Sequence, residues 1–348
     1  MNNKKILGLA APILCLSVTT QAAELAVSGQ VNRAMMAVDD GDKTETYFVD
    51  NTNSSTRFRF VATGQITETI EAGARLEMEF ESNPSSAISR QNPSISSELQ
   101  ERHADIFFKG PFGEIYLGQG DGAANGITHK DLSGTGVVAL LGHAHMMGGG
   151  TQFLDAGQAG PTVSQSIANF DFESRYDRMA YRTNQLGPLT LTASVGRKDE
   201  MIYEASAVYA SELGFGKVVT GLGYSSEEVE GGADSNDTVG GSASVLLNGG
   251  FNAALSYSRL EADAGYESAN TTFRLGYKSG RHASSIDYGI TEDRAQEGDE
   301  GTYMGVNYVY KPADWIELYG TGRVFALDRD DADFDDITVV ALGSRLKF

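Results

Sequence analysis

The sequence predicts an all-β protein, a closed antiparallel transmembrane β-barrel of 16 strands. Three observations lead to this prediction: apolar and polar residues alternate over most of the chain, long and short connections follow each other in strict order, and the final strand ends at Phe348. A membrane barrel shows such a pattern because only every second residue of each strand faces lipid. Helical 3.6-residue periodicity is hard to find after the N-terminal segment.

Residues 1–23 have the pattern of a cleaved signal peptide. Lys4 and Lys5 precede an apolar stretch, Ile6–Val18, and small residues follow it up to Ala23. A charged head, a short apolar middle and a small-residue exit are typical of secretory signals. We therefore expect cleavage after Ala22 or Ala23 and a single barrel domain over residues 24–348. The alternative is a buried N-terminal helix.

The charge of the chain excludes some partners. The formal net charge is −20, and removal of the two signal lysines leaves −22. Such a chain is repelled by nucleic acid and by acidic headgroups. The one cysteine, Cys15, lies in the signal, so the mature domain is expected to contain no disulfide.

Sixteen segments alternate as strands do. The third is the clearest, because Ala72, Ala74, Leu76, Met78 and Phe80 alternate with mostly charged residues, and a pleated strand places the two sets on opposite faces. The predicted strands are Leu25–Val38, Thr56–Ile66, Ile70–Glu81, Leu99–Lys109, Glu114–Gln119, Arg178–Asn184, Leu189–Arg197, Tyr203–Ser211, Lys217–Ser225, Thr238–Leu247, Phe251–Leu260, Ser268–Lys278, His282–Thr291, Thr302–Tyr310, Ile316–Leu327 and Ile337–Phe348.

The lengths of the connections distinguish a membrane barrel from a soluble sheet. Long links cover residues 39–55, 82–98, 120–177 and 226–237, and tight ones cover 109–113, 213–216, 248–250, 279–281 and 311–314. Short periplasmic turns and long extracellular loops are typical of membrane barrels. A ring of 16 strands is also too wide for side chains to fill, which predicts an aqueous channel.

Four stretches resemble the general porins of Gram-negative bacteria, which are trimeric 16-stranded barrels of the outer membrane. These stretches are Thr56–Gly64, the hairpin Arg102–Gln119, Arg178–Gly187 and the last strand ending at Phe348. The resemblance covers nearly the whole mature chain. It implies export to the bacterial outer membrane, a homotrimer, and a third loop that folds into the lumen, here residues 121–177.

The resemblance also implies a charged constriction. Arg57 and Arg102 correspond to basic wall residues and Arg175 is a looser match, while Arg59 and Arg75 share the alternation of lumen-facing charges. Arg178 and Arg182 of the matching sixth strand complete the predicted basic wall. The acidic motif of enterobacterial porins is absent, so we take Asp131 as the first acidic candidate, with Asp121 and Asp155 beside it.

Strand 4 presents a conflict. Its alternation turns Ala104, Ile106 and Phe108 outward and His103 and Asp105 inward, which would point Arg102 outward as well. The resemblance places Arg102 in the lumen, and we expect that orientation.

The last strand carries Val340, Leu342, Leu346 and Phe348 on one face. A terminal aromatic residue with such a face suits the membrane interface. In the porin family this pattern is recognised by the barrel-assembly machinery, which makes Leu346 and Phe348 the predicted assembly signal. The alternative is the edge strand of a soluble sheet.

Two groups of residues contain the kinds of side chain that bind metal ions. His129, His143 and His145 suggest zinc, but the spacing is loose and no nearby cysteine or carboxylate completes a ligand set, so no metal site and no cofactor is predicted there. The acidic outer loops suggest weak Ca²⁺ or Mg²⁺ binding that bridges to lipopolysaccharide phosphates, with a solvated acidic surface as the alternative.

These observations predict a porin for passive diffusion of small hydrophilic solutes and ions, with a preference for cations. A substrate-specific channel and a non-conducting adhesin or receptor barrel are the alternatives. An enzyme is not expected, because no Gly-x-Ser-x-Gly elbow is present and no motif ties a histidine to a serine, as a lipid hydrolase would need.

Overall fold

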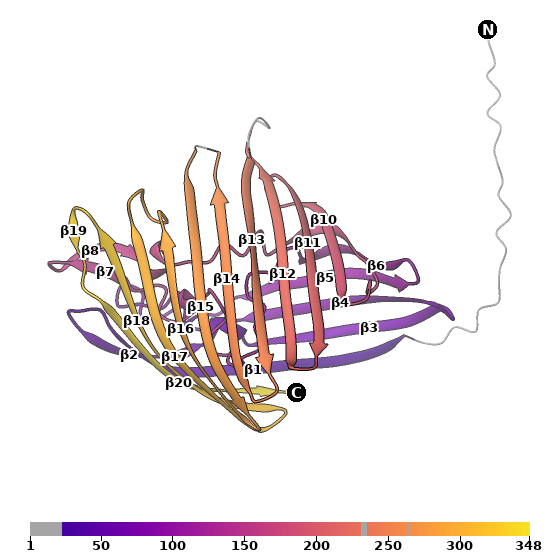
Figure 1. Cartoon of the computed structure of the whole chain (residues 1–348), viewed down its shortest axis with the longest axis horizontal. Helices are drawn as coiled ribbons and strands as arrows, with labels where there is room; N and C mark the ends of the chain where they lie inside the picture. The colour runs from indigo at the N-terminus through magenta and orange to yellow at the C-terminus, as the bar shows by residue number, and fades with distance from the viewer. Residues whose placement is uncertain (1–22, 231–234, 264) are drawn as a thin grey trace, which may run out of the picture.

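A computed structural model describes residues 23–230, 235–263 and 265–348, and these residues form a closed antiparallel barrel (Figure 1). The sheet contains 18 strands; β2 (Thr44–Asp50) and β19 (Ala332–Asp333) are short additions, which leaves 16 in the ring. The ring strands are β1 (Glu24–Asp39), β3 (Arg57–Thr67), β4 (Ile70–Phe80), β5 (Leu99–Gly110), β6 (Gly113–Asp121), β9 (Arg175–Arg182), β10 (Leu189–Arg197), β11 (Met201–Leu213), β12 (Gly216–Glu228), β13 (Ser235–Leu247), β14 (Phe251–Glu261), β15 (Glu267–Ser279), β16 (His282–Glu292), β17 (Glu300–Ala313), β18 (Ile316–Arg329) and β20 (Ile337–Lys347). Each coincides with a predicted segment. The predicted signal peptide lies outside the described residues except for Ala23.

The ring closes between the first and last strands. β1 pairs with β3 through Glu24–Gln30 and with β20 through Gln30–Asp39. At the seam the Gly29 N–H donates to the Phe348 carbonyl at 2.9 Å, and the Phe348 N–H donates to the Gly29 carbonyl at 3.0 Å. A Cβ on Gly29 would lie 2.5 Å from Cζ of Phe348, so the ring of the last residue rests directly on Gly29 and a larger residue there would displace it.

Alternation along the strands separates the two faces of the barrel. In β14, Phe251, Leu255 and Tyr257 are exposed on the outside, whereas Ser256 and Ser258 are buried inside. Exposed aromatic residues gather beside the short turns and at the chain end, at Phe112, Phe215, Phe251, Trp315 and Phe348. Aromatic residues at the end of the barrel where the short turns lie form one interfacial girdle of a membrane barrel.

The short turns lie where the tight links were predicted. Gly250, between β13 and β14, has a φ of +88°, and a Cβ there would lie 2.2 Å from the Lys278 carbonyl oxygen. Glycine is required because other residues rarely adopt this backbone and the neighbouring strand is too close.

Some elements within the long links were not predicted. β2 forms a hairpin with the outer half of β1, and Arg33 to Asp39 pair with Asp50 to Thr44. The loop between β6 and β9 contains β7 (Gln152–Asp155), β8 (Gln158–Thr162) and the short helix α1 (Val163–Ser166). Two single turns of 3-10 helix, Thr52–Ser54 and Ala144–Met146, also lie in loops.

The predicted entry of the third loop into the lumen is confirmed. We call residues 122–174 the inserted loop; it lies along the inner surface of β10 to β18, and in Figure 1 it runs behind the front strands β11 to β16. Serine side chains of the strands form hydrogen bonds with the backbone of this loop. The Lys130 N–H donates to Ser242 Oγ at 2.9 Å, and Ser256 Oγ donates to the Thr128 carbonyl at 2.6 Å. Inward glycines leave room for it, since a Cβ on Gly223 would lie 2.8 Å from the Phe172 ring.

The hydrophobic core lies between this loop and the barrel wall, rather than between two sheets. Val138, Met147 and Phe153 of the inserted loop pack in one buried cluster with wall residues such as Met36 and Phe325. The first loop joins them: Asn51 Nδ2 donates to the Val137 carbonyl at 2.9 Å. Burial of this apolar surface fixes the loop inside the barrel.

Within the described ranges, no helix is long and apolar enough to cross a membrane.

Candidate functional site

A cavity of about 930 Å³ lies between the inserted loop and the part of the wall that the loop leaves uncovered. Its charged lining consists of Arg57, Arg102, Arg175, Lys311 and Arg345 on the cationic side, with the carboxylates Glu79, Glu81, Asp121, Asp171 and Glu317. His129, His143 and His145 add to the loop side. The arrangement is a narrowed aqueous passage with charged walls.

Glu77 forms ion pairs with three arginines of the basic wall on β3, β4 and β5. It is buried, and its carboxylate binds Arg102 Nε at 2.7 Å, Arg59, and Arg57 Nε at 3.9 Å. Arg102 also pairs with Glu79. The carboxylates hold the guanidinium groups of Arg57 and Arg102 in place beside the cavity, whereas Arg59 binds Glu77 and does not line the cavity.

Arg102 faces the lumen, as expected, and a β-bulge explains the conflict on this strand. Glu77 pairs with His103 and Met78 with Glu101, so Arg102 is left without a partner in the register. A bulge allows two successive side chains to point to the same side. Arg102 and His103 therefore both point inward, while Ile106 and Phe108 point outward as the alternation predicts.

Three predicted arginines lie around a second cavity, of about 390 Å³, nearer to the short turns. Arg75 and Arg178 both bind the buried Asp105, at 2.7 and 2.9 Å. Arg182 lines the same cavity and is exposed. These residues lie on the short-turn side of the larger cavity.

The acidic candidates lie in three different places. Asp121, at the end of β6, lines both cavities and pairs with Arg175 at 2.9 Å. Asp155 of β7 forms a β-bridge with Phe334 at the outer end of the barrel. Asp131 contacts the wall, where Arg274 Nη1 donates to it at 2.8 Å.

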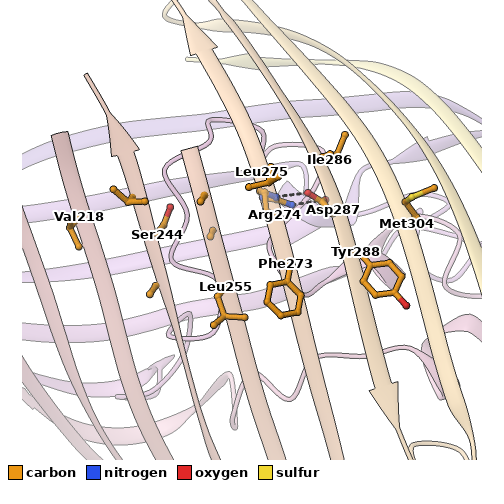
Figure 2. Close-up of a pocket in the computed structure, with 14 residues that line it drawn as sticks. Val218, Ser244, Leu255, Phe273, Arg274, Leu275, Ile286, Asp287, Tyr288 and Met304 are labelled. Carbon is orange, nitrogen blue, oxygen red and sulfur yellow. Dashed lines mark hydrogen bonds and ion pairs between the residues drawn. The ribbon is translucent and has the colours of Figure 1, made fainter. Parts of the chain in front are cut away.

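Arg274 holds the inserted loop to β15 and β16. Its side chain is fully buried and also donates to both oxygens of Asp287, at 2.6 and 2.8 Å (Figure 2). The neighbouring Phe273, Leu275 and Tyr288 line a groove of about 580 Å³ on the outer face. This groove is apolar and belongs to the lipid-facing band. Arg274 and Asp287 therefore point toward the lumen, whereas the residues next to them in the strands point toward the membrane.

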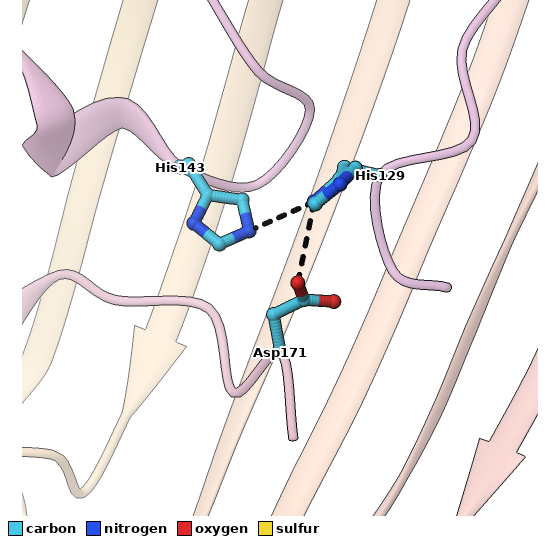
Figure 3. Close-up of side chains that lie close together, drawn as sticks. All are labelled: His129, His143 and Asp171. Carbon is cyan, nitrogen blue, oxygen red and sulfur yellow. Dashed lines mark hydrogen bonds and ion pairs between the residues drawn. The ribbon is translucent and has the colours of Figure 1, made fainter. Parts of the chain in front are cut away.

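A cluster of His129, His143 and Asp171 lines the cavity from the loop side (Figure 3). His129 Nδ1 lies 3.2 Å from His143 Nε2 and 3.5 Å from Asp171 Oδ2. Burial lowers the pKa of His143 to about 4, so this imidazole is neutral at pH 7. Asp171 was not among the predicted residues, because it is distant from the histidines along the chain.

Glu81 follows β4 and lines the cavity with one carboxylate oxygen unpartnered. Burial, helped by the nearby Asp50 and Glu79 carboxylates, raises the pKa of Glu81 to about 7. Glu77, Glu79, Glu81, Glu317 and Arg345 were not among the predicted site residues. Their inward position in alternating strands next to basic residues is the signal that could have identified them.

A closed barrel with an apolar outer band, an aromatic girdle and a lumen narrowed by an inserted loop defines an outer-membrane channel. A family profile described as Gram-negative porin matches residues 9–330, and the chain belongs to this family. Members of this family are channels of the bacterial outer membrane, not enzymes, and they work without a cofactor.

Solved structures with the same fold include two channels of other bacteria. The anion-selective porin from Comamonas acidovorans is 17% identical, with 94% of this chain and 100% of that chain covered and a TM-score of 0.68. The outer membrane channel DcaP of Acinetobacter baumannii is 15% identical, with 95% and 99% covered and a TM-score of 0.61. A search of curated proteins finds no match. At these identities the likeness shows the fold.

Proposed function

We propose that this channel passes small hydrophilic solutes and ions by passive diffusion, with a weak preference for cations. The observation that carries the proposal is the cavity of about 930 Å³ between the inserted loop and the basic wall. Charged groups face each other across it without closing it, and a solute is then sorted by its charge and dipole as it passes.

The preference for cations rests on charge outside the cavity. Inside it, the five cationic side chains and the five carboxylates named above balance. The mature chain carries −22 if the signal is removed, and acidic residues crowd the outer loops, for example from Asp328 to Asp336. An acidic mouth concentrates cations, and salt screens that effect beyond about 10 Å at 0.1 M. The preference should therefore weaken as ionic strength rises.

Within this proposal the predicted residues act at different positions along the channel. Arg57, Arg102 and Arg175 form the cationic side of the constriction, with Asp121 as their nearest predicted carboxylate and Arg59 acting through Glu77. Arg75, Arg178 and Arg182 attract anions in the second cavity. Asp131 anchors the inserted loop, and Asp155 acts at the outer rim.

Planar-bilayer recording of the purified protein tests the proposal. A stable open conductance with a reversal potential that favours K⁺ over Cl⁻ in a KCl gradient is expected. A closed trace would favour the adhesin or receptor barrel, and solute-dependent current noise would favour a substrate-specific channel. A reversal potential of the opposite sign would contradict the cation preference.

We also propose a homotrimer, an N-terminal signal removed after Ala22 or Ala23, and recognition of Leu346 and Phe348 by the barrel-assembly machinery. The supports are membership of the porin family, the N-terminal sequence pattern and the exposed outward face of β20. Weak Ca²⁺ or Mg²⁺ binding between the outer loops and lipopolysaccharide is part of the same proposal. Cross-linking of the native protein, N-terminal sequencing and calorimetric titration with Ca²⁺ test these points separately.

A further inference from the structure

The cluster of His129, His143 and Asp171 has the geometry of a metal site. Its potential ligand atoms all lie within 4.8 Å of one another, and two of the separations are 3.2 and 3.5 Å. Ligands at about 2.0–2.1 Å from a tetrahedral zinc ion are about 3.4 Å apart. His129 Nδ1 is thus already spaced from each of the other two groups as two ligands of one ion are, and the separation between His143 and Asp171, within 4.8 Å, would shorten on binding. The three residues come from distant parts of the inserted loop.

We propose that His129, His143 and Asp171 bind a divalent transition-metal ion, Zn²⁺ in the first place, reversibly and inside the channel. Two imidazole nitrogens and one carboxylate oxygen are a ligand set that zinc uses when a further position stays open. The side chains of His129 and Asp171 are 26% and 12% exposed, and all three residues line the cavity, so the ion can enter from the lumen.

The carboxylate is held by groups that leave it free to bind the ion. The Gly126 N–H donates to Asp171 Oδ2 at 3.0 Å, and Thr128 Oγ1 donates to Oδ1 at 2.6 Å. A carboxylate oxygen accepts more than one hydrogen bond or ligand contact, so these bonds orient Asp171 without using its full capacity. Such outer contacts reduce the ordering cost of binding.

Without a metal, His129 Nδ1 and His143 Nε2 lie 3.2 Å apart and form a hydrogen bond in which one nitrogen carries the hydrogen and the other accepts it. A metal ion bound to both nitrogens would replace this hydrogen bond.

The position of the site gives it a consequence for transport. A bound Zn²⁺ adds two positive charges to a lining in which cationic and acidic side chains balance. It should lower the single-channel current and shift selectivity toward anions. This consequence rests on the proposed channel function, whereas binding of the ion does not.

Calorimetric titration of the full chain in detergent with ZnCl₂ tests the binding. We expect one saturable site per chain, and a loss of affinity of roughly 10-fold or more in His129→Ala and in Asp171→Asn. His282→Ala is the matched control, because His282 lies beside a short turn on the outer face, stacked on Tyr310. Heat-modifiable migration of each variant on gels checks that the barrel has folded.

Two results would overturn the proposal: no saturable binding by the folded wild-type chain, or equal affinity in the wild type and both site variants. In bilayers, micromolar Zn²⁺ should reduce the current of the wild type and of His282→Ala but not of His129→Ala. Binding without any change in current would overturn the effect on transport. A wild type that binds Zn²⁺ but never conducts would contradict the channel function and leave the metal site standing.

Discussion

The two halves of the inner barrel wall carry different side chains. Strands β10 to β18 present mainly small ones, such as Ser242, Ser256 and Gly223, and these are covered by the inserted loop. The half from β3 to β9 presents long charged ones, such as Arg57 and Arg102, which reach into open space. One alternating strand pattern therefore serves two purposes: it holds a loop in place and it lines a passage.

The difference follows from what each half faces. A loop backbone brought into a barrel needs hydrogen-bond partners, and a serine hydroxyl supplies one without filling the space that the loop occupies. Arginine in the open half remains next to water and is kept in place by carboxylates such as Glu77. A buried charge cluster in the covered half, Arg274 with Asp131 and Asp287, joins the loop to the wall.

The largest effect is expected from loss of this cluster. Arg274→Ala leaves two buried carboxylates without their shared cation, which should lower the free energy of unfolding by about 3–5 kcal/mol. Urea unfolding of the folded barrel measures it. The inserted loop should also loosen, which bilayer recording would detect as larger and noisier currents.

Arg259→Ala is the matched control, because Arg259 lies partly exposed near the outer rim and pairs with Glu261 and Glu267. Its loss should change the free energy of unfolding far less than the loss of Arg274, because ion pairs in contact with solvent contribute little to stability. Equal effects of the two variants would show that Arg274 is not an anchor.

A smaller effect is expected in the open half. A unit charge about 6 Å away in water changes an ion's energy by about 0.7 kcal/mol, roughly threefold in local ion concentration. The double variant Arg57→Gln/Arg102→Gln should therefore raise the cation-to-anion permeability ratio several-fold. Reversal potentials in a KCl gradient measure this ratio.

Arg281→Gln, at an exposed short turn, is the control for that shift. If it moves the reversal potential as far as the double variant does, the basic wall of the open half does not determine selectivity.

The smallest effect concerns pH. With its pKa raised to about 7, Glu81 is neutral at pH 5 and negative at pH 9. The gained negative charge faces Asp50, Glu79 and Arg102, and it should raise the cation preference between pH 6 and 8, by less than about twofold at 0.1 M salt. Glu81→Gln should remove this step in the reversal potential. A step that persists in the variant would assign it to another group.

Strand positions could be predicted from the sequence because alternation and turn residues are local. All sixteen ring strands were predicted, and β2 was missed because its residues stand in a link that the barrel pattern does not need. The orientation of Arg102 depended on a bulge, which shifts the alternation by one residue, and the sequence carries no separate signal for that shift.

The site was less predictable because the inserted loop makes it. Asp131 was expected beside the passage, yet a partner on β15, Arg274, holds it against the wall. The metal cluster was set aside for want of a carboxylate, and Asp171 reaches the histidines only because the loop folds back on itself. Contacts between residues far apart in a loop have no periodic signature.

The bond between Gly29 and Phe348 also bears on how the barrel forms. Nearly the whole chain separates the two partners, so this contact contributes strongly to the contact order, and folding with many such contacts is slow. The edges of β1 and β20 stay open until the last residue has been synthesised and delivered. A barrel whose seam has not yet closed exposes the edges of β1 and β20, and unpaired edges invite aggregation unless another protein covers them.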